Sequence, residues 1–99
     1  MLSDADRRKA AEILIAAEET RTPAVQLTKT FPDIRIEDSY AISALVTEMK
    51  IQKGARLIGH KIGLTSKAMQ ASSQIDEPDY GHLLDTMLLN DGAKVRFED

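Results

Sequence analysis

Hydrophobic residues near the N-terminus recur at the spacing of an amphipathic helix. The apolar positions lie three, four and seven residues apart, at Ala10, Ile13, Leu14 and Ala17. This pattern predicts a helix from about Ser3 to Thr20 with one apolar face. Ser3 or Asp4 can cap its start, and the Thr22-Pro23 pair predicts its end.

A second helix is predicted from about Ile36 to Lys53. Its apolar face is formed by Ile42, Leu45, Val46 and Met49. Glu37 and Asp38 fall in its first turn, where the helix dipole favours acidic residues, and Gly54 is a suitable stop. Residues 23–35 between the two helices are predicted to be an irregular connector, with three possible hydrophobic anchors: Val25, Leu27 and Phe31.

The pattern changes after Gly54. Residues 55–64 have strand character, and the glycines at 59 and 63 predict a bulge or a close approach of the backbone to another group. Ser66 can cap a short helix from Lys67 to about Ser72. The remaining predicted elements are an acidic loop at 76–81, a strand at 83–89, a turn at 90–92 and a last strand at 93–97.

These elements predict an α+β fold, with two N-terminal helices followed by a small mixed unit of strands and a short helix. A chain of 99 residues forms one domain at most. Because the last predicted strand leaves a bare edge near the C-terminus, we expect the chain to be part of a larger protein.

Composition narrows the class of protein. The net charge is −3 without a basic stripe, so a nucleic-acid partner is not expected. Cys is absent, which excludes disulfides and Cys-ligated zinc. No apolar run approaches the ~20 residues of a membrane span, and the N-terminus does not resemble a signal segment. We therefore expect a soluble, cytoplasmic protein without a membrane partner.

The densest polar stretch is Gly59-His60-Lys61-Ile62-Gly63-Leu64-Thr65-Ser66-Lys67. It is not a phosphate-binding loop, because three residues rather than four separate its glycines and Leu follows the second. Lys61, on a strand that leads into a helix N-terminus, could hold a carboxylate. On composition alone, a surface strand with solvated His60 and Lys61 is the better reading.

An acidic stretch contains Asp76, Glu77, Asp79 and Asp85. Such oxygen ligands suit Mg²⁺ or Ca²⁺, but the spacing does not match an EF-hand loop, and Pro78 turns neighbouring side chains in different directions. A solvated turn is therefore the favoured interpretation. Asp79 differs, because it lies at a stiff corner between Pro78 and Tyr80-Gly81, where a fixed carboxylate near a lysine could act as a general acid–base.

Longer runs of residues resemble a known family. The run Gly59–Gln70, the continuation Ala71–Ile75 with Glu77–Gly81 and Leu83–Asp85, and the upstream run Pro32–Ala41 are similar to the 2-keto-4-pentenoate hydratase family of the fumarylacetoacetate hydrolase superfamily. The resemblance spans about residues 10–92. The stretch from Gln70 to Gly81 is most similar to the branch that hydrates 2-oxo-hept-4-ene-1,7-dioate in the breakdown of aromatic compounds.

The resemblance implies a lyase that adds water to a double bond conjugated with a 2-oxo acid. It implies Lys61 and Asp79 as catalytic residues, with Leu64 and Ser66 presenting groups to a 2-oxo dicarboxylate substrate. It also implies a homo-oligomer and a Mg²⁺ or Mn²⁺ cofactor. The family's metal ligands, a Glu-x-Glu pair and a later acid, follow the region that is matched here, and no Glu-x-Glu occurs in this chain.

Residues 1–99 are accordingly expected to be the N-terminal domain of a β-rich hydratase, without its metal-binding catalytic domain and inactive by themselves. Two alternatives remain open. One is the sister decarboxylase that acts on 4-oxalocrotonate, which shares much of this region. The other is a non-catalytic domain for oligomerisation or interaction.

Overall fold

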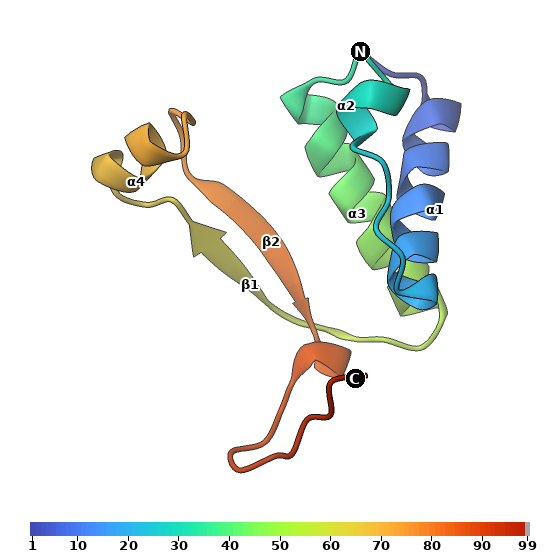
Figure 1. Cartoon of the computed structure of the whole chain (residues 1–99), viewed down its shortest axis with the longest axis vertical. Coiled ribbons are helices and arrows are strands. Elements are labelled where there is room, and N and C mark those ends of the chain that lie inside the picture. The colour runs from blue at the N-terminus through green and yellow to red at the C-terminus, as the bar shows by residue number, and fades with distance from the viewer. Residues whose placement is uncertain (99) are drawn as a thin grey trace. The chain divides into compact units, whose positions relative to one another are not determined.

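The computed structural model describes residues 1–98, which form two compact units, one over Met1–Gly54 and one from Ala55 onward (Figure 1). The first unit is helical. The second contains a two-stranded sheet and short helices. The predicted α+β class is therefore confirmed. No helix in the part of the chain that the structure describes is long and apolar enough to cross a membrane.

Helix α1 (Asp4–Thr20) begins as predicted, because the Ser3 hydroxyl accepts a hydrogen bond from the Asp6 N–H at 3.1 Å. It ends at Arg21, whose φ of 55° is left-handed. The predicted apolar face was wrong at Leu14, which is exposed, whereas Ala11 and Ile15 are buried beside Ala10. Two neighbouring i, i+4 stripes are both apolar in this helix, and only packing against another element selects one of them.

The connector contains a four-residue helix, α2 (Leu27–Thr30), which the sequence did not predict. The Phe31 N–H closes it by donating to the Leu27 carbonyl at 2.7 Å. Leu27 and Phe31 pack into the core, so two of the three predicted anchors are confirmed. Val25 was predicted wrongly, because its side chain remains 65% exposed.

Helix α3 (Ile36–Gln52) buries Ile42, and three of its other apolar residues pack against the same core: Leu45, Val46 and Met49. The predicted face of this helix is confirmed. Helices α1 and α3 lie side by side and run in the same direction (Figure 1). Near their C-terminal ends Lys50 binds Glu18 at 2.8 Å and Lys53 binds Glu19. These pairs are partly or fully exposed and contribute little stability.

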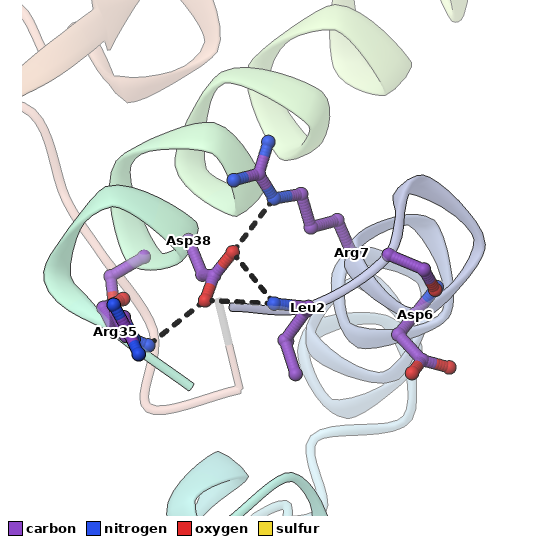
Figure 2. A network of polar contacts seen from close by, with 7 residues as sticks. Leu2, Asp6, Arg7, Arg35 and Asp38 are labelled. Atoms are coloured by element: carbon purple, nitrogen blue, oxygen red, sulfur yellow. Dashed lines mark hydrogen bonds and ion pairs between the residues drawn. The ribbon is translucent and has the colours of Figure 1, made fainter. Parts of the chain in front are cut away.

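Asp38 joins the N-terminal ends of the same two helices (Figure 2). Its buried carboxylate accepts from Arg7 Nε at 2.8 Å, from the Arg35 N–H at 2.9 Å and from the Leu2 N–H at 3.2 Å. Burial raises the pKa of Asp38, but these hydrogen bonds and the Arg7 charge together lower it below its usual value. The sequence predicted only a dipole-favoured acid here. The structure makes Asp38 the polar centre of the first unit.

The second unit is a hairpin-like sheet of β1 (Leu57–Gly63) and antiparallel β2 (Asp79–Leu84), with α4 (Lys67–Ser72) in the connection between the strands. The register shifts between Leu57 and Gly59, which confirms the predicted bulge. Helix α4 has the predicted bounds and the predicted cap, since the Ser66 hydroxyl accepts from the Met69 N–H at 3.2 Å.

Two predicted strands differ from the structure. The strand expected at 83–89 begins earlier, at Asp79, and gives way to a 3-10 helix at Asp85–Met87. The cause is Asp85, whose N–H donates to the Arg56 carbonyl while its carboxylate accepts from the Arg56 N–H, both at 2.9 Å, which ends the pairing. Residues 93–97 form no strand, although the turn at 90–92 is present, with the Ala93 N–H bound to the Asn90 carbonyl.

Candidate active site

The register of the hairpin brings Lys61 and Asp79 onto one face of the sheet. Lys61 is paired with Gly81, and Gly63 is paired with Asp79. Directly opposed residues of an antiparallel ladder share a face, and so do residues two apart on one strand. Lys61 and Asp79 therefore occupy diagonal corners of a four-residue patch. The sequence alone did not bring these residues together.

The Lys61 side chain lies along this patch. Its Cγ is 3.9 Å from the position that a Cβ on Gly81 would occupy, and its Nζ is 3.5 Å from the corresponding position on Gly63. The ammonium group thus extends toward the strand pair that contains Asp79. The Asp79 carboxylate itself accepts a hydrogen bond from the Tyr80 N–H at 2.9 Å. A cation and a fixed carboxylate on one open face suit the binding and proton transfer of a small anionic substrate.

The other face of the hairpin has a different character. It carries two further strand pairs, His60 with His82 and Ile62 with Tyr80. The two imidazole rings lie 5.2 Å apart at an interplanar angle of 56°. Because alternate residues point to opposite faces, these side chains are separated from Lys61 by the sheet. Neither histidine is therefore part of the Lys61–Asp79 patch.

Leu64 follows directly after β1 in an unusual backbone conformation. Its φ is 54°, in the left-handed region that a branched residue rarely adopts. Its carbonyl accepts a hydrogen bond from Gln70 Nε2 at 2.9 Å, and Gln70 is one of the buried polar residues of the described chain. Gln70 thus anchors the corner at which β1 turns toward α4, a role that the sequence analysis missed.

Ser66 is the N-cap of α4, four residues before Gln70. Its oxygen accepts the Met69 N–H, which leaves its hydroxyl proton able to donate a hydrogen bond. The only sequence signal for Gln70 is this spacing, since a residue four positions after a cap faces the capped end of the helix. Leu64 and Ser66 therefore flank the end of the strand that carries Lys61.

Loss of the Gln70 anchor is expected to loosen this corner. Gln70→Leu leaves the Leu64 carbonyl without its donor, which costs about 1–3 kcal/mol. The Met69 and Gln70 amides that cap α4 should then exchange with solvent roughly 5- to 100-fold faster, as measured by hydrogen exchange. Met69→Leu changes an exposed neighbour and serves as the control. Unchanged exchange in Gln70→Leu would contradict the assigned role.

The acidic stretch does not form a metal centre. Among residues 1–98 no group of three or more His, Asp and Glu side chains is arranged to hold a metal ion. Asp76, Glu77 and Asp79 are exposed, while Asp85 binds the Arg56 N–H. The residues described here therefore do not fit a bound Mg²⁺ or Mn²⁺, and Lys61 and Asp79 remain the predicted catalytic residues of this chain.

Several characterised proteins are similar to this chain. A 2-oxo-hept-4-ene-1,7-dioate hydratase from Escherichia coli is 52% identical over 85 residues, which cover 86% of this chain and 32% of that protein. A 2-keto-4-pentenoate hydratase from Paraburkholderia xenovorans is 40% identical over 89 residues, covering 90% and 33%. A comparison with models of protein families gives no match.

A solved structure has the same fold. The 4-oxalocrotonate decarboxylase from Pseudomonas putida G7, complexed with calcium and acetate, superposes with a TM-score of 0.80 and 29% identity, covering 87% of this chain and 33% of that chain. The same enzyme is also known in complex with magnesium and adipate. The chain thus spans about one third of the length of the relatives that it matches. In sequence and in fold, the chain is therefore similar to about one third of 2-keto-4-pentenoate hydratases and of a 4-oxalocrotonate decarboxylase.

Proposed function

We propose that the full-length protein containing this chain is a hydro-lyase that adds water to 2-oxo-hept-4-ene-1,7-dioate in aromatic catabolism. The observation that carries the proposal is the Lys61–Asp79 diagonal on one sheet face, in a chain 52% identical to a hydratase of that name. Residues 1–99 are then its N-terminal domain. As the family resemblance implies, the protein works as a homo-oligomer. We place it in the cytoplasm, because a chain without Cys suits a reducing compartment.

The reaction needs a proton to move along the carbon chain before water can add. Loss of a proton from C3 of the substrate, next to the 2-oxo group, gives a dienolate. Return of a proton at C5 gives the 3-ene, whose double bond is conjugated with the carbonyl. Water then adds its hydroxyl at C4 and a proton at C3. In each of these steps, negative charge either forms on the 2-oxo oxygen or is removed from it.

Lys61 and Asp79 carry the groups that this proton transfer and charge stabilisation require. The Lys61 ammonium can donate to the substrate carboxylate or to the enolate oxygen, where charge develops. The Asp79 carboxylate can move the proton or orient the water. Leu64 and Ser66, at the end of the same strand, present a backbone group and a hydroxyl to the substrate. The small dicarboxylate that the structural neighbour binds, adipate, supports a dicarboxylate as the ligand class.

A divalent cation completes the proposal. Mg²⁺ or Mn²⁺ would act as an electron sink for the 2-oxo acid, and the calcium and magnesium complexes of the structural neighbour support this ion class. Since the described residues form no such site, the ligands would lie in the remaining two thirds of a full-length family member.

A second candidate is decarboxylation of 4-oxalocrotonate. It is favoured by one observation, the fold match to a decarboxylase of that name with a TM-score of 0.80. The hydratase remains the better proposal, because the decarboxylase is 29% identical to this chain and the hydratase 52%. The two reactions differ in their products, since only decarboxylation releases CO₂.

Product analysis on the full-length protein tests the choice. With Mg²⁺ present, we expect loss of the 2-hydroxydienoate absorbance and formation of the 4-hydroxy-2-oxo product without release of CO₂. The 99-residue chain alone, assayed beside it, is expected to be inactive because it lacks the metal-binding domain. CO₂ release from 4-oxalocrotonate would instead favour the decarboxylase, and turnover by the 99-residue chain would contradict its expected inactivity.

A further inference from the structure

Three glycines lie in the hairpin: Gly59 and Gly63 on β1, and Gly81 on β2. None of them has a positive φ, since the glycines with that conformation are Gly54 and Gly92. Their backbone conformations are therefore open to any residue. Glycine in the interior of a strand weakens the sheet by roughly 0.5–1 kcal/mol relative to alanine. Its presence at these positions consequently needs a reason other than backbone geometry.

For Gly63 and Gly81 the reason lies in the space that the missing side chains leave. A Cβ on Gly81 would be 3.9 Å from Lys61 Cγ, and one on Gly63 would be 3.5 Å from Lys61 Nζ. Both distances are ordinary van der Waals contacts, so a single methyl group would fit between the lysine and the backbone at either position, whereas a larger side chain would reach the space that the lysine occupies. Gly59 differs, because its Cβ would meet Leu83 Cδ1 at 3.8 Å and no atom of Lys61.

The two glycines also separate Lys61 from Asp79. Each of them is the direct cross-strand partner of one of the two charged residues. Opposed side chains in a sheet stand about 4.5–5.5 Å apart at Cβ, and diagonal ones about 7–8 Å apart. A lysine that stood upright would not bridge that diagonal, whereas one that lies flat along it brings its ammonium beside the Gly63–Asp79 pair.

We propose that Gly63 and Gly81 are positioning residues. Together they form a strip of the sheet surface without side chains, the glycine track, along which Lys61 lies so that its ammonium group faces substrate beside Asp79. This inference rests on the proposed function for its catalytic consequence. A side chain larger than that of alanine at 81 would lift the aliphatic part of Lys61 off the sheet. A side chain larger than that of alanine at 63 would crowd its ammonium with carbon and displace water and anionic substrate from it.

Valine at either position tests the glycine track. Valine is favoured in strands, so Gly63→Val and Gly81→Val should keep the sheet while filling the space under Lys61. Misplacement of a catalytic group by about 1 Å can cost about 10²-fold in rate, and we expect kcat of the full-length protein to fall by that order in each variant. Gly59→Val, on the same strand, is the matched control, because its Cβ would meet Leu83 and no atom of Lys61, and it should retain kcat within about threefold.

A double-mutant cycle measures whether the loss of kcat in the valine variants depends on the presence of Lys61. If the glycines only position the lysine, Gly63→Val should cause no further loss of kcat in a Lys61→Ala background. A full additional loss in that background would overturn the proposal. So would an unchanged kcat in both valine variants while Lys61→Ala is impaired.

A structural measurement tests the position of Lys61 on the glycine track independently of the proposed reaction. In nuclear Overhauser spectra of the 99-residue chain, the γ-protons of Lys61 should contact an α-proton of Gly81, and its ε-protons should contact an α-proton of Gly63. Gly63→Val should abolish the contact between the ε-protons and the α-proton at position 63. These contacts support the glycine track even if Lys61→Ala leaves kcat intact, which would defeat only the proposed function. Their absence from the wild-type chain would overturn the glycine track whatever the kinetics.

Discussion

Replacement of Lys61 by alanine is expected to lower kcat of the full-length protein by about 10²-fold or more. The expected size is that of a positioned group that acts on charge or a proton in the transition state. The ammonium of Lys61 lies over Gly63, the direct partner of Asp79. Alanine removes the only cation among the four residues of this patch, and with it the donor that the proposed reaction requires for the enolate oxygen.

Asp79→Asn should produce a loss of the same order, because the amide keeps the shape of the carboxylate but cannot accept and return a proton. The assay is loss of dienol absorbance with Mg²⁺ present. Lys94→Ala and Asp91→Asn, at exposed positions outside the hairpin, are the matched controls. If both active-site variants retained the wild-type kcat, these residues would be structural, and the chain would be better understood as a packing and assembly domain.

Replacement of Asp38 by alanine is expected to have the largest effect on stability. It removes the acceptor of Arg7 Nε and of two backbone N–H groups at once, in a carboxylate that is fully buried. Donors left without a partner in the interior are costly, and we expect the melting temperature of the helical unit to fall by roughly 10 °C or more. The melting temperature is measured from the helical circular dichroism signal. Glu37→Ala, a substitution of the exposed neighbouring residue, is the control. A fall of only a few degrees would mean that water replaces the lost acceptor.

The same carboxylate predicts a pH dependence. Since its pKa in the folded chain is lowered from the ordinary value of 3.8, the unfolded chain binds the proton more readily than the folded one. The stability that Asp38 contributes is therefore fully present above about pH 4 and is lost as the pH falls through the lower folded value. Wild type should lose melting temperature over this acidic range. Asp38→Asn should lose less, and an equal loss in both would assign the acid sensitivity to other groups.

The pattern of hydrophobic and polar residues was sufficient to predict the elements that depend on contacts between residues close together in the chain. The bounds of α1, α3 and α4 follow from apolar spacing and from the caps Ser3 and Ser66, because a cap is a contact between residues three apart in the chain. The bulge at Gly59 and the α+β class also followed from the sequence. The longer runs that resemble the hydratase family led to Lys61 and Asp79 as candidates.

Contacts between distant residues needed the tertiary structure. Whether Leu14 or Ile15 faces the core of α1 depends on where α3 packs, and the extent of β2 depends on Asp85 binding Arg56, 29 residues away. The buried carboxylate of Asp38 is bound by Leu2, which precedes α1, and by Arg7 of α1.

The sequence by itself determined which residues could carry the chemistry. Only the cross-strand register decided that Lys61 and Asp79 share a face with two glycines between them. A slip of one residue in that register would have sent Asp79 to the face opposite Lys61, because side chains alternate along a strand.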